Sequence, residues 1–337
     1  MIKYPFLENG ATIGVTAPSS GVPAELHGLL KTACERMKMN GFHVICGDTV
    51  WNQDKARSAS AEKRAEEFNA MMLDDNIHII IPPWGGELLI EMLEYLDFDN
   101  IQNKWILGYS DTSLLLLATT LKTGIATAHG TNLIDLRGEY SDDTTKMWQS
   151  VLSTKKGESI LQQSSFKYQK EWEFDKPTPC IFNLTEETEW KSTSNSKVAI
   201  KGRLLGGCID TIRHLIGTPF GEIQNFKENY IKGESIIWFF ENCGLSTTDL
   251  RRSLVQMKLA GWFERCSGIV FGRSPANYPV SNYTAEDVYK ELSEELQMPI
   301  IYDIDCGHVP PQITLINGAY AEVESNSGKG KILQKFI

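Results

Sequence analysis

KWILGYSDTSLLLL, residues 104–117, passes from a strand-like apolar run into a helix-like run of leucines at the turn GYSD. Ser110 stands at that turn. A serine on a sharp turn from strand to helix projects its hydroxyl away from the sheet, and the amides that open the helix stabilise negative charge beside it. This is the geometry of an activated nucleophile, although the stretch taken alone favours a helix cap. Ser110 or Asp111 would form such a cap, for which both residue types are well suited.

Strand and helix patterns alternate on both sides of this turn. The predicted strands of the N-terminal half cover 11–17, 42–46, 77–81, the run around Trp105 and 124–130, and the predicted helices cover 24–39, 59–73, 87–95 and the run from Leu114. Such alternation predicts a doubly wound parallel sheet. Ligands of these sheets bind beyond the carboxyl ends of the strands, which is where Ser19, Gly86, Ser110 and His129 fall.

The chain divides into two predicted domains joined by a bridge. A length of 337 residues fits two domains of ordinary size. A polar, irregular stretch at 157–197 separates an N-terminal domain at 1–156 from a C-terminal domain at 198–337. In the C-terminal domain, strands are predicted at 198–205, 235–240, 267–272, 299–304, 319–323 and 331–336, and helices at 209–216, 247–260 and 284–296. The sequence thus predicts a second α/β domain.

Composition and charge limit the kinds of partner. The formal net charge of −10 argues against a nucleic-acid backbone as the main partner, because that binding depends on clustered Lys and Arg. The first residues lack the apolar core of a signal peptide, and no later run is long enough to cross a bilayer, so we expect a cytoplasmic protein with no membrane partner. The seven cysteines are scattered, and zinc and phosphate-loop motifs are missing, so we expect no metal and no cofactor.

Three chemically complementary residues directly follow predicted strands: Ser110, Glu241 and His308. In a serine hydrolase, a histidine takes the proton of the hydroxyl and passes it to the leaving group, while a carboxylate orients the imidazole. The glycine pair that ends at Gly86 offers a loop amide, which could donate to an oxyanion together with the amide of Asp111. The set predicts a serine hydrolase that cleaves an amide next to a substrate carboxyl terminus.

Each of these residues also has a purely structural interpretation. Glu241 fits a solvated or capping residue, His308 a hydrogen-bonded loop histidine, and the glycines a tight turn. His129 is a rival base, since it belongs to the same predicted sheet as Ser110. The residue pattern by itself does not rank His129 below His308. A non-catalytic two-domain ligand-binding protein would share the same domain outline.

Five motifs together resemble the LD-carboxypeptidase family of serine peptidases. They are LGYSDT at 107–112, Gly85-Gly86, GRLLGG at 202–207, Phe240-Glu241 and Gly307-His308. The resemblance runs through nearly the whole chain. It implies a flavodoxin-like first domain, a strand-rich α/β second domain and an active site in the cleft between them. It also implies a homodimer.

The resemblance assigns a role to each motif residue. It implies that Ser110 is the nucleophile, Glu241 the orienting acid and His308 the base. Gly86 and Asp111 would supply the amides of the oxyanion hole. The rival histidine on the first sheet, which also has a counterpart in the family, then takes a structural role.

Within the family, the sequence is more similar to the microcin C self-immunity branch than to the murein-recycling branch, because of its long bridge with Trp172 and Trp190 and its segment 202–207. Members of the first branch cleave the amide between a C-terminal aspartate and a nucleotide. Members of the second remove the terminal D-alanine of muropeptide tetrapeptides. The expected partner is therefore a peptidyl-nucleotide or a small peptide, with Trp172, Trp190 and Cys208 as candidate substrate contacts. Cys208 stands where family members often carry Asn.

Overall fold

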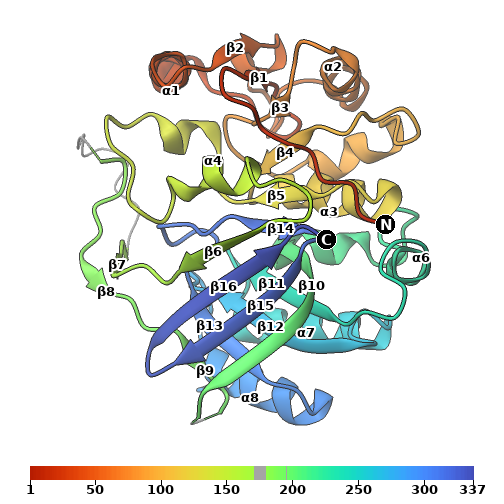
Figure 1. The fold of residues 1–337 in the computed structure, drawn as a ribbon, viewed down its shortest axis with the longest axis vertical. Helices are drawn as coiled ribbons and strands as arrows, with labels where there is room; N and C mark the ends of the chain where they lie inside the picture. Colours follow the sequence, from red (N-terminus) through yellow and green to blue (C-terminus); the bar gives the residue numbers. More distant parts are fainter. Residues whose placement is uncertain (171–179, 195) are drawn as a thin grey trace.

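Two β-sheets organise the fold, and they occupy the upper and lower parts of the molecule in Figure 1. The structure, a computed structural model, describes residues 1–170, 180–194 and 196–337. In these residues, six strands form the first sheet, eight form the second and two form a separate hairpin. The mixed α/β fold class that the alternating patterns predicted is confirmed.

The first sheet is built from the predicted N-terminal strands. They are β1 (Thr12–Val15), β2 (His43–Cys46), β3 (Ile79–Ile80), β4 (Trp105–Gly108) and β5 (Thr127–His129), accompanied by helices α1 (His27–Met39), α2 (Ala61–Leu73), α3 (Thr112–Thr123) and α4 (Met147–Leu152). The five strands pair in parallel in the order β5-β4-β3-β1-β2. Strands β1, β3, β4 and β5 are buried throughout, which explains their nearly continuous apolar sequence.

The segment predicted as a helix at 87–95 forms the 3₁₀ helix η3 (Leu89–Tyr95) instead of an α-helix. Residues three apart lie on the same face of a 3₁₀ helix. Leu89 and Met92 have this spacing, and both are buried. The tighter winding thus turns both side chains to the core. The other short 3₁₀ helices of the described chain are η1 (Ala24–Leu26), η2 (Thr49–Trp51), η4 (Leu133–Leu136) and η5 (Arg213–Leu215).

The second sheet combines a parallel centre with antiparallel flanks. Its strands are β10 (Val198–Cys208), β11 (Ile236–Glu241), β12 (Cys266–Gly272), β13 (Ile300–Ile304), β15 (Tyr320–Asn326), β16 (Lys329–Lys335), β6 (Ser159–Gln163) and β9 (Lys191–Ser192), and its helices are α5 (Ile209–Ile212), α6 (Ile223–Asn229), α7 (Thr247–Leu259) and α8 (Ala285–Leu296). The order is β6-β16-β15-β10-β11-β12-β13-β9, with β10 to β13 parallel. The carboxyl ends of β11 and β13 therefore lie at the same edge of the sheet.

The stretch at 157–197 contributes to this second sheet. Strand β6 pairs with β16 at one edge, and β9 pairs with β13 at the other. Between them, β7 (Lys167–Tyr168) and β8 (Glu186–Glu187) form the separate hairpin. The stretch that was predicted as an irregular bridge thus supplies both edge strands of the second sheet.

One strand of the C-terminal half crosses to the first sheet. Strand β14 (Leu315–Asn317) pairs antiparallel with β5, so the otherwise parallel first sheet gains an antiparallel edge that the sequence pattern did not predict. Asn317 is fully buried there. Its Oδ1 accepts from the Gly206 amide at 2.8 Å, and its Nδ2 lies 3.4 Å from Thr127 Oγ1. Asn317 thereby connects β10 of the second sheet with β5 of the first.

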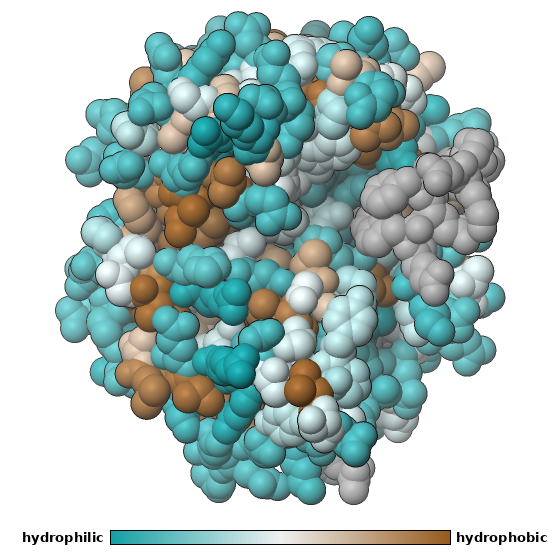
Figure 2. Space-filling model, turned by 180° about the vertical axis from the view of Figure 1, so that it is seen from behind, coloured by the Kyte–Doolittle hydropathy of each residue, from teal (hydrophilic) through white to brown (hydrophobic). Residues whose placement is uncertain are grey.

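A single apolar cluster extends through both halves of the molecule. It includes Leu115 of α3, Leu205 of β10, Ile209 of α5 and Phe240 of β11. Figure 2 shows the face of the molecule opposite to the one seen in Figure 1. This face is mainly hydrophilic, and its apolar patches gather mostly on the left side of the view. Among the described helices, none combines the length and the apolar character needed to cross a bilayer.

Candidate active site

Ser110 lies in the turn between β4 and α3 with a φ of +65°, in the left-handed region that side chains rarely adopt. The amide of Ser113 donates to its carbonyl at 2.9 Å and starts the helix. Gly108 is required just before the turn, because a Cβ there would lie 3.0 Å from Thr112 Cγ2 and 3.1 Å from Asn132 Oδ1. The sequence therefore forces a strained turn that presents the hydroxyl of Ser110.

His308 connects Ser110 with Glu241. Its Nε2 lies 3.1 Å from Ser110 Oγ, and its Nδ1 lies 2.7 Å from Glu241 Oε2. Glu241 is the last residue of β11 and is fully buried, whereas the side chain of His308 keeps 15% exposure. With Nδ1–H donating to the carboxylate, Nε2 is left to accept from the serine hydroxyl. The structure thus brings the three predicted residues into one hydrogen-bonded chain.

Burial and charge act in opposite directions on this pair. Burial works to raise the pKa of Glu241, but the charge and the hydrogen bond of His308 outweigh it, and the pKa is lowered. Burial works to lower the pKa of His308, but the charge of Glu241, together with hydrogen bonds to Cys243 and Glu241, outweighs it, and the pKa is raised well above its ordinary value. Each partner therefore favours the charged form of the other.

The glycine pair 85–86 packs against Ser110 and its neighbours. A Cβ on Gly85 would lie 2.6 Å from Ser110 Cβ and 3.0 Å from the Asp111 amide nitrogen, and one on Gly86 would lie 2.3 Å from Ser20 Oγ. Only residues without a side chain fit this approach. The amide of Asp111 and the loop at Gly86, which were predicted as the oxyanion hole, therefore lie beside Ser110.

The carboxylate of Asp111 has a structural task that sequence reasoning missed. It is buried, and its Oδ2 accepts from Ser19 Oγ at 2.5 Å and from the Leu89 amide at 2.8 Å. Burial raises its pKa despite these hydrogen bonds. Asp111 thus ties the loops after β1 and β3 to the turn at Ser110. The only signal in the sequence was an acidic residue at a helix start.

His129, the rival base, lies in a different environment. It is fully buried on β5, its Nδ1 lies 3.7 Å from Cys306 Sγ, and burial lowers its pKa to about 4. The ring of Tyr109 packs edge-on against both His129 and His308, with centroids 6.4 and 5.1 Å away. Of the two histidines, it is His308 whose imidazole hydrogen-bonds Ser110.

The three predicted substrate contacts have different outcomes. Cys208 ends β10 directly opposite Glu241 in the strand register, so it borders the Ser110 site. Trp190 is only 1% exposed, packs in the core of the second sheet and donates from Nε1 to Asp305 Oδ2 at 2.9 Å. The prediction that Trp190 contacts a substrate is therefore wrong, because its ring is enclosed by protein. Trp172 lies outside the described residues.

Asp305, like Asp111, is a buried carboxylate with several hydrogen-bond partners whose role the sequence did not predict. Besides Trp190, it accepts from Ser165 Oγ at 2.6 Å and pairs with Arg273 Nη2 at 2.5 Å. It stands three residues before His308, at the end of β13. The network thereby anchors the loop that carries His308 to the segment after β6. A carboxylate directly after a buried strand was the available signal.

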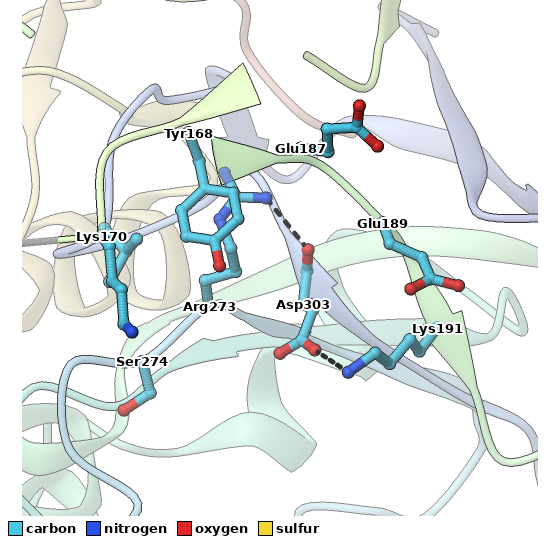
Figure 3. Close-up of a pocket in the computed structure, with 9 residues that line it drawn as sticks. Tyr168, Lys170, Glu187, Glu189, Lys191, Arg273, Ser274 and Asp303 are labelled. Atoms are coloured by element: carbon cyan, nitrogen blue, oxygen red, sulfur yellow. Dashed lines mark hydrogen bonds and ion pairs between the residues drawn. The ribbon is translucent and has the colours of Figure 1, made fainter. Parts of the chain in front are cut away.

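Two cavities lie beside the cluster of Ser110, Glu241 and His308. One of about 320 Å³ is lined by the glycine pair and by Ser20, Gln53 and Trp84. The other, of about 300 Å³, lies under the β7–β8 hairpin, as Figure 3 shows. Two residues of its wall connect it to this cluster. Val309 directly follows His308, and Ser274 Oγ donates at 2.7 Å to the carbonyl of Asn242, which directly follows Glu241.

The cavity under the hairpin is rich in charge. It is lined by Tyr168, Lys170, Glu187, Glu189, Lys191, Arg273, Ser274, Asp303 and Val309. The Arg273 guanidinium packs on the Tyr168 ring at 4.6 Å, and Lys191 pairs with Asp303 at 3.1 Å, as Figure 3 shows. This wall can offer polar contacts to a bound molecule.

Comparison with known proteins gives matches along the chain. The model of the LD-carboxypeptidase N-terminal domain matches residues 13–130, and that of the LD-carboxypeptidase C-terminal domain matches residues 201–323. A Vibrio cholerae protein provisionally named a carboxypeptidase is 27% identical over 100% of this chain and 99% of its own length.

Two further proteins are similar in structure. The microcin C7 self-immunity protein MccF of Escherichia coli is 26% identical over 97% of this chain and 94% of its own. A structure of MccF in complex with aspartyl sulfamoyl adenosine has a TM-score of 0.82 at 23% identity, covering 100% of both chains. The muramoyltetrapeptide carboxypeptidase of Oxalobacter formigenes has a TM-score of 0.74 at 20% identity, covering 96% of this chain and 99% of that chain.

Proposed function

The chain belongs to the LD-carboxypeptidase family of serine peptidases, and from this we propose that it hydrolyses an amide next to a substrate carboxyl terminus, with Ser110 as nucleophile, His308 as base and Glu241 as orienting acid. The observation that supports the assignment is the pair of hydrogen bonds that His308 makes, at 3.1 Å to Ser110 and at 2.7 Å to Glu241. If His308 had only a structural role, the protein would gain nothing from holding Ser110 in a strained turn beside it.

The proposed steps need only these side chains and water. Ser110 Oγ attacks the carbonyl carbon while His308 Nε2 takes the hydroxyl proton, and the resulting oxyanion receives hydrogen bonds from the amides of Gly86 and Asp111. His308 then gives the proton to the departing nitrogen, and an ester on Ser110 remains. Water hydrolyses the ester with His308 again as the base, which regenerates the enzyme.

We propose a peptidyl-nucleotide as the substrate, so that the enzyme cleaves the amide after a C-terminal aspartate and confers resistance to a microcin C-like antibiotic. The support is the similarity to MccF, whose structure contains aspartyl sulfamoyl adenosine. The two cavities beside the triad would receive the parts of the substrate on either side of the scissile bond. The proposal includes a cytoplasmic homodimer, which light scattering of the purified protein would test.

Hydrolysis of the murein tetrapeptide is the second candidate function. It is supported by the similarity to the muramoyltetrapeptide carboxypeptidase of Oxalobacter formigenes, whose TM-score is lower than that of MccF. A competition assay with both substrates in one tube decides between them. We expect a higher kcat/KM for aspartyl sulfamoyl adenosine, and preferential release of D-alanine would contradict the first candidate.

Ser110→Ala tests the catalytic assignment. We expect the variant to lose about 10³-fold or more in kcat on the preferred substrate, since removal of a triad nucleophile in a serine protease costs about 10⁶-fold. His129→Gln is the matched comparison, because it changes a buried histidine that is not bonded to Ser110. If Ser110→Ala keeps its turnover, the assignment is wrong.

A further inference from the structure

Cys208, Glu241 and His308 form a compact set of metal-binding side chains. One ligand atom of each lies within 4.8 Å of the other two. Cys208 and Glu241 face each other across the parallel ladder of β10 and β11, so the sheet register fixes their spacing. His308 is fixed by its bonds to Glu241 and Ser110. The donor atoms are therefore held by rigid elements.

One oxygen of the Glu241 carboxylate is only weakly bonded. Oε2 accepts from His308, whereas no donor among the described residues meets hydrogen-bond geometry at the buried Oε1, and a hydrogen bond from the neighbouring Cys208 thiol helps to lower the pKa of this carboxylate. The same thiol also lies 3.5 Å from Asp210 Oδ2. A thiol is a weak donor, so this buried carboxylate oxygen keeps most of its capacity to bind a further group. A cation beside Oε1 would use that capacity.

We propose that Cys208, Glu241 and His308 bind a thiophilic divalent cation of the zinc type, and that this cation inhibits the enzyme. Thiolate, imidazole and carboxylate are the ligands that zinc takes in proteins, and three protein ligands leave a fourth position for water. Hard cations such as magnesium prefer all-oxygen sites, so the thiol selects against them. The side chain of His308 is 15% exposed, and the site lies just beneath the surface.

Inhibition follows from the protons that the metal displaces. Coordination through Nδ1, the nitrogen that faces Glu241, requires that nitrogen to release its proton, and the Cys208 thiol releases another. A neutral imidazole with a metal on Nδ1 keeps its single proton on Nε2. It therefore cannot accept the proton of Ser110. Because both ligands must be deprotonated, we expect metal affinity to rise with pH.

Cobalt spectroscopy tests the site without relying on activity. We use Co²⁺ as the probe and the Ser110→Ala protein, which keeps all three ligands. Thiolate coordination gives Co²⁺ a strong near-ultraviolet charge-transfer band, and Zn²⁺ should remove this band by displacement. We expect the band at one equivalent of Co²⁺, and its loss in the Cys208→Ser version of the same protein.

The matched control is Cys46→Ser. Cys46 lies far from the site in the sequence, with its Sγ 3.6 Å from Cys34 Sγ, and its substitution should leave the band unchanged. A band that survives Cys208→Ser, or its absence from the parent protein, overturns the proposal. Thermal unfolding verifies that the Cys208→Ser protein is folded, and Cys208→Ala takes its place if it is not.

Zinc inhibition of the active enzyme gives the functional readout. We expect chelation to restore activity, and Cys208→Ser to raise the zinc concentration for half-inhibition by about 100-fold or more, because loss of a mere supporting partner of a ligand already costs about 10- to 100-fold. Equal zinc sensitivity of the two proteins contradicts the proposal. Failure of the catalytic assignment would appear separately, as unchanged turnover in Ser110→Ala.

Discussion

Ser110 carries a backbone conformation that costs energy in the folded state. Its φ of +65° suits glycine, whereas a Cβ in the left-handed region is penalised. We therefore expect Ser110→Gly to exceed Ser110→Ala in free energy of unfolding by about 1 kcal/mol, although both lack the nucleophile. Urea unfolding of the two variants measures the difference.

The same pair of substitutions at Ser113 provides the control. Ser113 lies within α3, where glycine is less favourable than alanine by about 1 kcal/mol. The order of stability should therefore reverse between the two positions. If Ser110→Ala is as stable as Ser110→Gly, the turn at Ser110 holds no strain.

The pH dependence of hydrolysis should follow His308. The base must be neutral, and its pKa is raised well above the ordinary value because the charge of Glu241, with the hydrogen bonds of Cys243 and Glu241, outweighs burial. We expect kcat/KM to be low in acid, to rise with pH, and to level off only above the ordinary titration range of histidine. Measurement at substrate concentrations far below KM reports this pKa in the free enzyme.

Glu241→Gln should move that rise to lower pH. The amide removes the negative charge that holds the proton on His308, so the pKa of the imidazole falls. The plateau rate should also fall, by about 10⁴-fold if the loss of the correct tautomer costs what it costs in trypsin. Glu322→Gln, on the remote strand β15, should leave the profile in place. An unshifted rise in Glu241→Gln would contradict the proposed pairing.

At the scale of elements, the loop after β3 depends on close contact with the nucleophile turn. A methyl group on Gly85 would lie 2.6 Å from Ser110 Cβ and 2.8 Å from its Oγ, so one of the two turns must move. We expect Gly85→Ala to lower kcat by about 10²-fold or more, because a small misplacement of the reacting group is enough for such a loss. Steady-state kinetics measures it.

Gly28→Ala is the comparison for that variant. Gly28 lies in α1, and nothing lies within 4 Å of the position that a methyl group on it would take, so alanine there should keep the rate and even favour the helix. A Gly85→Ala protein as active as Gly28→Ala would show that the glycine is not needed for the approach.

Local sequence patterns predicted most strands and helices, and they also predicted that the three proposed catalytic side chains stand at the carboxyl ends of strands. Ser110, Glu241 and His308 each follow an apolar strand, and parallel strands present their carboxyl ends at one edge. That reasoning could not choose between His129 and His308, because the choice depends on which sheet faces the serine. The family resemblance favoured His308, and the distances in the structure agree with that choice.

Long-range pairing is what the patterns could not supply. Three features join segments that are far apart in the chain. Trp190 is enclosed by buried residues of the second sheet, its indole bonds to Asp305, and β14 pairs with a strand of the first sheet. An aromatic residue in a polar stretch looks the same in sequence whether it lines a cleft or fills a core. Only the tertiary contacts separate the two.

At the scale of the whole molecule, the two sheets are tied together around the site. Strand β14 lies between two strands of the second sheet in the sequence, but it pairs with β5 of the first sheet. Its residue Asn317 hydrogen-bonds Gly206 of the second sheet and Thr127 of the first. A single apolar cluster continues across the junction. Since Ser110 belongs to one sheet and His308 to the other, this connection holds their 3.1 Å contact.

We therefore expect the two halves to unfold together. Calorimetry should show one transition whose calorimetric and van't Hoff enthalpies agree. Asn317→Ala should lower the free energy of unfolding by about 1–3 kcal/mol, since it leaves the buried Gly206 amide without its acceptor. It should also reduce kcat, because the site loses its connection between sheets. Asn326→Ala, at the end of β15, should do neither. Two separate transitions in the parent protein would mean that the halves are independent and that the triad assembles only when they close.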